Sequence, residues 1–161
     1  NIIPKLVKEN KNIHTILVNR IEADDVIAVC SKYIRKKYPN NTVYVVSGDK
    51  DFYQLGYDNL YFADYKKKEH LNFTRKQAKE ELRQKIINGD CSDNIKPILQ
   101  NVKLSKSEKN KILNDKKEMI NYLNKNKNVR KKYILNRRLI SFKYIPKIYQ
   151  KKVLKIVKNI I

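Results

Sequence analysis

The stretch "TVYVVSGDKD", residues 42–51, joins a short apolar run to two closely spaced acids. Thr42 to Ser47 is rich in β-branched residues and has the length of a buried strand in a parallel sheet. Asp49 and Asp51 follow at once, so we expect both carboxylates at the carboxyl end of that strand. In open α/β sheets this edge is where ligands bind. The stretch therefore predicts an α/β core with an acidic site at one edge of its sheet.

A second apolar run, "NIHTILV" (residues 12–18), has the composition of another buried strand. The acids Glu22, Asp24 and Asp25 follow that run closely. Between the two runs, apolar residues recur with the period of an amphipathic helix, at Ala23, Val26, Ile27, Cys30 and Ile34. Strand, helix and strand predict a right-handed βαβ unit, which places both strand ends at one edge. We therefore expect five carboxylates to converge there.

The middle of the chain carries a third acidic cluster. The run "LYFAD" (60–64) predicts a short strand. Thr74 is expected to cap a helix that leads to the segment "NGDCSDN" (88–94), a loop that carries Asp90 and Asp93. Each of the three clusters thus follows a predicted strand or helix directly.

Beyond this loop the apolar spacing is helical. Ser105 and Glu108 predict a capping box at the start of one helix, and Pro146 is expected to open the last one. The segment "NKNKNVRKK" (Asn124 to Lys132) predicts a surface linker. The chain is therefore predicted to have a parallel-sheet α/β core in residues 1–94 and an all-helical region in residues 95–161.

The composition excludes several classes of protein. A chain of 161 residues can bury roughly 70% of its unfolded surface, as a single domain does. Cys30 and Cys91 lack the spacing of a zinc site or a disulfide framework. No apolar run reaches the ~18 residues of a membrane span, and no segment resembles a signal peptide, so we expect an intracellular protein. The formal net charge of +21 favours a polyanionic partner.

The acids are gathered in clusters and are not mixed evenly with the lysines. Taken singly, each has an ordinary structural explanation, because Asp24 or Asp25 can cap a helix and Asp51 can cap the turn after it. Asp90 and Asp93 can form an Asx turn. Caps explain poorly why seven of the 16 acids double up in three clusters, namely Glu22, Asp24, Asp25, Asp49, Asp51, Asp90 and Asp93.

Divalent cations give these clusters a chemical purpose. Like charges packed closely repel one another and raise pKa values unless a positive group lies among them. Mg²⁺ prefers oxygen ligands and accepts carboxylates from several loops. Two such ions about 3.5–4 Å apart stabilise the attacking and leaving oxygens of a phosphoryl displacement. An acidic, metal-loaded site on a basic body suits phosphodiester hydrolysis.

Three motifs in this order, "EADDVIA", "SGDKDFYQL" and "INGDCSDNI", resemble the 5′-3′ exonuclease and flap endonuclease family, most closely its viral or phage type. The resemblance covers residues 13–100, and "LNRRLISFKYIP" near the end is also similar. It implies a PIN-like α/β core followed by a helix-hairpin-helix element. It also implies a Mg²⁺-dependent 5′ nuclease that cleaves DNA in replication or repair.

The resemblance assigns roles to the acids. It implies two Mg²⁺ ions, with Mn²⁺ as a substitute, and Asp25 as a further ligand or a residue that acts through the ligands. All seven clustered acids form the implied catalytic set. The implied metal ligands are Glu22, Asp24, Asp49, Asp51, Asp90 and Asp93.

Two features depart from the family pattern. The family's first strand, which ends in an Asp, and its helical arch have no counterpart here, and the only methionine is Met119. We therefore expect the C-terminal part of a longer protein, weak or inactive alone. The hairpin after "SDNI" lacks the family's glycines. The DNA contacts that we expect there come from Lys96, Lys103, Ser105 and Lys106.

The sequence thus predicts a monomeric, structure-specific 5′ nuclease that acts on DNA ends and flaps, with RNA–DNA hybrids as a further candidate. A noncatalytic nucleic-acid-binding remnant is the alternative, and its DNA binding would not depend on Mg²⁺. A sugar transferase that uses Asp49 and Asp51 as a DxD metal site is a weaker alternative. That enzyme would bind a nucleotide sugar, and it would leave the other two acidic clusters unexplained.

Overall fold

The computed structural model describes residue 5 and residues 8–64 and 66–161. The chain divides into two compact units. The first unit comprises residues up to Asn72 together with Ile145–Ile161, and the second unit comprises Phe73–Tyr144. The functional boundary expected near residue 94 stays a prediction.

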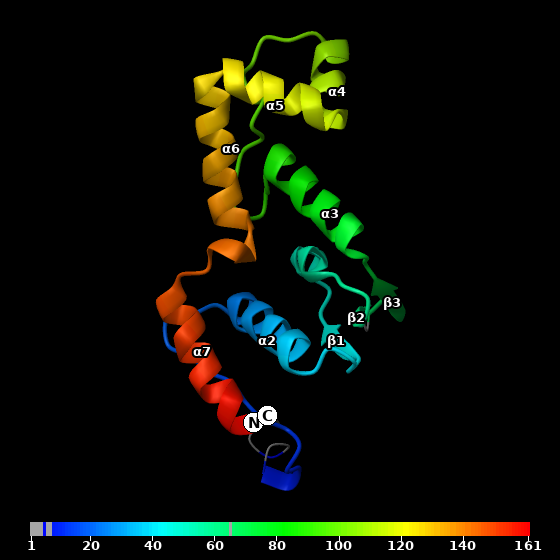
Figure 1. The fold of residues 1–161 in the computed structure, drawn as a ribbon, viewed down its shortest axis with the longest axis vertical. Coiled ribbons are helices and arrows are strands. Elements are labelled where there is room, and N and C mark those ends of the chain that lie inside the picture. Colours follow the sequence, from blue (N-terminus) through cyan, green and yellow to red (C-terminus); the bar gives the residue numbers. More distant parts are fainter. Residues whose placement is uncertain (1–4, 6–7, 65) are drawn as a thin grey trace. The chain divides into compact units, whose positions relative to one another are not determined.

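The first unit contains a three-stranded mixed sheet (Figure 1). Its strands are β1 (Val43–Val46), β2 (Leu60–Asp64) and β3 (Glu69–Asn72), in the order β1-β2-β3. β1 pairs with β2 in parallel, and β2 pairs with β3 antiparallel. The strands expected at residues 42–47 and 60–64 are confirmed, and their carboxyl ends lie at the same edge of the sheet because the two run parallel.

The strand expected at residues 12–18 is wrong. In the structure, residues 13–18 form no strand, and the side chain of Leu17 is 87% exposed. Among the described residues, this apolar run does not pair with β1, whose only strand partner is β2. The expected βαβ unit is therefore not formed. The parallel connection runs instead from β1 through a 3₁₀ helix, η1 (Lys50–Leu55), to β2.

The first unit also contains the helices α2 (Ala23–Lys37) and α7 (Lys147–Ile160). They pack against each other and bury apolar side chains, including Val26 and Val29 of α2 and Val153 and Val157 of α7. The Lys37 ammonium and the Tyr38 hydroxyl also donate hydrogen bonds to the carbonyl oxygen of Ile161, at 3.2 and 3.1 Å. The amphipathic helix expected after residue 22 is confirmed, and so is the last helix, which Pro146 precedes.

The second unit is helical. Its elements are α3 (Arg75–Asn88), α4 (Lys106–Asn114), α5 (Lys116–Lys125), α6 (Lys127–Ile140) and the 3₁₀ helix η2 (Phe142–Tyr144). Capping boxes start α3 at Thr74 and α4 at Ser105, as the sequence predicts. The helices close over one apolar core, made of Ile87, Ile98, Leu99, Ile112, Met119, Leu123 and Val129.

The linker expected at Asn124 to Lys132 is wrong. α5 ends at Lys125 and α6 begins at Lys127, so only Asn126 separates the two helices. Lysine and arginine are good helix formers, and their charges do not prevent a helix on a solvated face. The buried side chain of Val129 also favours a helix here, because it packs in the core of the second unit and so holds the first turn of α6 in place.

Candidate metal-binding acids

The acids at the start of α2 are crowded together without serving as caps. Glu22 occupies the N-cap position, but its side chain makes no capping hydrogen bond. Asp24 and Asp25 lie in the first turn, where the helix dipole favours negative charge. Burial raises the pKa of the Asp25 carboxyl above its ordinary value, and the charges of Asp24 and Glu22 raise it further. The capping alternative therefore does not account for this cluster.

Asp49 and Asp51 follow the carboxyl end of β1. Asp49 is the N-cap of η1: its Oδ1 accepts the backbone N–H of Asp51 at 2.8 Å, and its own N–H donates to Ser47 Oγ at 3.1 Å. Asp51 lies in the first turn of η1 and is half-buried. The cap that we considered for Asp51 is thus made by Asp49. One acid of this pair has a structural role, which does not prevent its second oxygen from binding a cation.

A further acid, Asp64, lies at the same sheet edge and was missed by the sequence analysis. It ends β2, beside the end of β1, and its Oδ2 lies 3.7 Å from the position that a Cβ on Gly48 would take. Its Oδ1 accepts the backbone N–H groups of Lys66 and Lys67 at 3.0 and 3.3 Å. The signal was available, because an acid that ends a strand parallel to β1 must come to the same edge.

The first unit does not gather its acids into one ready-made ligand set. Among its described residues, no three carboxylates place oxygen atoms within 4.8 Å of one another. The convergence of Glu22, Asp24, Asp25, Asp49 and Asp51 is therefore not seen as a three-carboxylate group.

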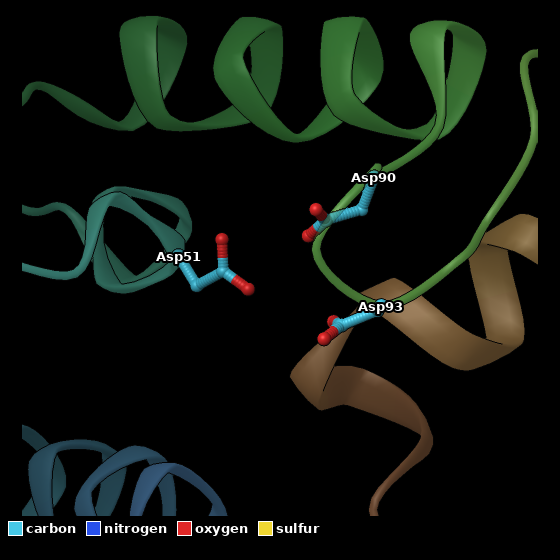
Figure 2. A group of neighbouring side chains, drawn as sticks. All are labelled: Asp51, Asp90 and Asp93. Carbon is cyan, nitrogen blue, oxygen red and sulfur yellow. The ribbon is translucent and has the colours of Figure 1, made fainter.

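In the second unit, the segment from Gly89 to Ile95, here called the acidic loop, carries the third cluster. Gly89 has φ +73° and ψ −170°, a conformation that favours glycine. Asp90 and Ile95 then pair through two backbone hydrogen bonds of 2.8 and 2.7 Å. Figure 2 shows the carboxylates of Asp90 and Asp93 turned to the same side of this loop, with oxygen atoms within 4.8 Å of each other.

Asp90 is held as an anion by its neighbours. The Lys85 ammonium lies 2.6 Å from its Oδ2, while the hydroxyl and the N–H of Ser92 donate to its Oδ1 at 2.6 and 3.0 Å. These contacts lower the pKa of Asp90 to about 2, with the Lys85 hydrogen bond as the largest cause and the Ser92 hydroxyl next. The Asx turn considered for this loop is therefore present at Asp90. Asp93 is exposed.

Asn136, a buried polar residue of α6, fixes the acidic loop from behind. Its side-chain amide donates to the carbonyl oxygens of Ile86 and Lys96, at 3.0 and 2.9 Å. These two carbonyls lie on either side of the acidic loop in the sequence. One side chain thus secures both ends of the loop, a role that sequence periodicity alone could not reveal.

Of the residues expected to contact DNA, Lys103, Ser105 and Lys106 lie at or just before the start of α4, and Lys96 directly follows the acidic loop. Lys96, Lys103 and Lys106 are exposed. Ser105 is occupied by its capping box, because its hydroxyl donates to Glu108 Oε2 at 2.6 Å and accepts the N–H of Glu108 at 3.2 Å. The hydrogen bonds from Ser105 also lower the pKa of Glu108. A carboxylate thus already sits at this helix N-terminus, so any phosphate contact there would have to come from the lysines.

The chemistry of the donors fits a hard divalent cation. All the clustered ligands are carboxylates, which Mg²⁺ and Mn²⁺ prefer over sulfur ligands. Burial raises the pKa of Asp25, and so do the charges of Asp24 and Glu22; a bound cation would relieve the part that comes from these charges. No helix among the described residues is both long enough and apolar enough to cross a membrane.

Comparisons with known proteins bear on this arrangement. The family model described as "5′-3′ exonuclease, N-terminal resolvase-like domain" matches residues 1–87. No curated protein sequence matches the chain.

Solved structures from bacteriophage T5 share the fold. A T5 protein co-crystallised with metal ions superposes with a TM-score of 0.70 at 19% identity, covering 97% of this chain and 65% of its own. The T5 flap endonuclease in a complex with DNA and metal ions gives 0.69 at 18% identity, covering 97% and 64%. The T5 5′-exonuclease with bound zinc gives 0.71 at 18% identity, also covering 97% and 64%. The fold class expected from the sequence, a partial parallel-sheet core followed by helices, is confirmed, and the chain spans less than two thirds of these proteins.

Proposed function

The chain belongs to the family of 5′-3′ exonuclease N-terminal resolvase-like domains, and from this premise we propose that it is the metal-binding part of a structure-specific 5′ nuclease. The observation that carries the proposal is the extent of the family match. Residues 1–87 include five of the seven clustered acids, those of "EADD" and "GDKD". The third motif, with Asp90 and Asp93, follows directly after the match.

The proposed ligands of two Mg²⁺ ions, for which Mn²⁺ would substitute, are Glu22, Asp24, Asp49, Asp51, Asp90 and Asp93. When bound, the ions would supply charge stabilisation for the attacking and leaving oxygens of a phosphodiester. The chain's own residues prepare the site in different ways. Lys85 and Ser92 keep Asp90 ionised well below neutral pH, while Glu22 and Asp24 concentrate negative charge around Asp25.

The proposed substrate is DNA with a 5′ end or flap. The net charge of +21 favours the phosphate backbone, since each neutralised phosphate releases counterions. The lysines expected to contact it are Lys96, Lys103 and Lys106, and Ser105 supports them through the capped start of α4. The T5 flap endonuclease in its complex with DNA is a precedent for that protein. For this chain, DNA binding is part of the proposal.

The test is cleavage of a labelled 5′-flap DNA in Mg²⁺ or Mn²⁺, by the 161-residue chain and by the full natural polypeptide. We expect Asp49→Asn with Asp51→Asn to lower the cleavage rate at least about 100-fold, because both are proposed ligands. The matched control is Asp58→Asn, which removes an exposed acid from the turn before β2 and should leave the rate unchanged.

A noncatalytic DNA-binding remnant makes the opposite prediction. Its affinity for flap DNA would be the same with Mg²⁺ and with a chelator, and no cleavage would occur even in the full polypeptide. These two results together would reject the nuclease proposal in favour of the noncatalytic remnant. Metal-dependent cleavage that survives the double substitution would instead reject these two acids as ligands.

A further inference from the structure

A groove of about 450 Å³ runs between α2 and α7 in the first unit, along the part of α2 from Val29 to Lys37. Its apolar part is formed by Val29 and Tyr33 of α2 and by Leu154 of α7. On each helix the lining residues follow at steps of three or four positions, so each helix contributes one continuous face. Figure 1 shows these two helices side by side.

Lysines surround this apolar surface. Lys32 and Lys36 of α2 and Lys158 of α7 line the groove and are exposed. None of the three forms an ion pair with a described acid, since the ion pairs of the described residues involve other lysines and arginines. A further lining lysine, Lys37, is engaged by the carbonyl of Ile161 and by the ring of Tyr33.

No acid lines the groove among the described residues. The nearest acid on α2, Asp25, is one turn before Val29, and α7 contains no acid at all. The groove is therefore an apolar surface whose charged lining residues are all positive. Such a surface is complementary to a ligand that carries both an apolar group and several negative charges.

We propose that this groove binds an acidic peptide segment that carries an apolar side chain. The apolar side chain lies against Val29, Tyr33 and Leu154, and the flanking carboxylates meet Lys32, Lys36 and Lys158. A nucleic-acid backbone would satisfy the lysines but would leave the apolar surface without a partner. The partner is thus a protein with an acidic, partly apolar segment, and this site is independent of the proposed nuclease acids.

The test uses fluorescence anisotropy with a labelled nine-residue peptide of Asp and Glu that has a central Leu-Phe pair. A second peptide replaces that pair with Ser-Ser. We expect the first peptide to bind at least tenfold more tightly than the second. Lys36→Glu with Lys158→Glu should weaken its binding at least tenfold, because both substitutions reverse charges that line the groove.

The matched control is Lys151→Glu with Lys155→Glu, which makes the same charge change on exposed residues of α7 outside the groove. It should weaken binding less than threefold. Circular dichroism is used to check that each variant keeps its helices. Amide chemical shifts in the unaltered chain should change on α2 and α7 when the peptide is added.

Three outcomes would overturn the proposal. Equal binding of the two peptides would reduce the groove to a general cationic surface. An equal loss in the control variant would show that only net charge matters. If the groove variant loses affinity for duplex DNA but keeps its affinity for the peptide, the groove belongs to the nucleic-acid surface.

Discussion

In the first unit the acids at the start of α2 repel one another, whereas in the second unit Asp90 is held by a lysine. Crowding and burial raise the pKa of Asp25, while Lys85 and Ser92 lower the pKa of Asp90 to about 2. The second unit therefore supplies its own counter-charge. At the start of α2, the charges of Asp24 and Glu22 instead add to the raised pKa of Asp25, a repulsion that a bound divalent cation would relieve.

Both units combine a buried apolar core with exposed apolar side chains. The core of the second unit is closed around Ile98, whose side chain is 0% exposed. In the first unit, β1 is an edge strand among the described residues, and the side chain of Val46 is 66% exposed. In the second unit, Leu135 and Leu139 of α6 are likewise 55% and 60% exposed, so each unit has a buried core and also keeps apolar side chains at its surface.

The largest effect should come from the glycines that precede the acids, Gly48 in the first unit and Gly89 in the second. A Cβ on Gly89 would collide with the backbone carbonyl oxygen of Ile95, and its φ of +73° disfavours any side chain. We expect Gly89→Ala to lower the free energy of unfolding by about 4 kcal/mol or more.

Gly48→Ala is the matched control, because the nearest atom to its new Cβ is a side-chain oxygen of Asp64 at an ordinary contact distance of 3.7 Å. It should cost less than about 1 kcal/mol. Urea denaturation measures both. Equal costs would show that the acidic loop is not held in the glycine-dependent conformation.

The next-largest difference in stability is expected between truncation of a buried side chain in the second unit and truncation of an exposed one in the first. Ile98→Ala removes a fully buried side chain from the second unit and should cost about 3 kcal/mol. Val46→Ala, on the exposed face of β1, should cost under about 1 kcal/mol. Thermal or urea unfolding of the two variants compares them directly, and a large cost at Val46 would mean that a second copy or another chain covers the edge of β1.

The two acidic sites should respond to pH with opposite sign. Asp90 has a depressed pKa in the folded state, so its contribution is present above about pH 4 and is lost as the pH falls towards about 2. It is worth about 1 to 2 kcal/mol, since Lys85 is partly exposed. Asp25 has a raised pKa, so its penalty at neutral pH is relieved as the pH falls through that pKa.

Stability measured against pH in chelator tests this pair. Asp90→Asn and Lys85→Met should each destabilise the protein at pH 7 and flatten the acid slope. Asp25→Asn should be neutral or stabilising at pH 7 without metal. The account fails on this point if Asp25→Asn destabilises as much as Asp90→Asn does under these conditions.

The smallest expected difference concerns helix starts. Ser105→Ala removes the hydroxyl that accepts the backbone N–H of Glu108 and that also bonds to the Glu108 side chain at the start of α4. The loss should lower the free energy of unfolding by about 1 kcal/mol. Glu22→Ala at the N-cap position of α2 removes a side chain that makes no capping hydrogen bond, so it should cost less than about 0.5 kcal/mol. Helicity and melting temperature, measured in chelator, distinguish the two.

Much of the fold could be predicted because local signals agreed with the tertiary structure. The apolar run before Asp49, the capping residues Thr74 and Ser105, and the helical spacing of α2 each carry their own information. The run at residues 12–18 has the composition of a strand, but a strand also requires a partner, which composition does not encode. The segment from Asn124 to Lys132 was misread because charge obscured the buried Val129.

The positions of the clustered acids along the helices and strands were largely predictable, whereas the local geometry around them was not. The clusters follow β1 and α3 and lie at the start of α2, yet the hydrogen bonds that distinguish Asp49 from Asp51 depend on backbone positions within one turn. Asp64 and Asn136 were missed, since each acts through strand register or a long-range contact.

The central claim is that these clustered acids bind divalent metal ions, and Mn²⁺ titration followed by amide NMR tests it most directly. We predict that low Mn²⁺ broadens the resonances of residues 22–25, 49–51 and 90–93 first, and that Asp49→Asn with Asp51→Asn abolishes this selectivity. Asp58→Asn should leave it intact. Broadening that is as strong at Asp58 and Asp115 as at the clusters, or unchanged by the double substitution, would contradict the claim.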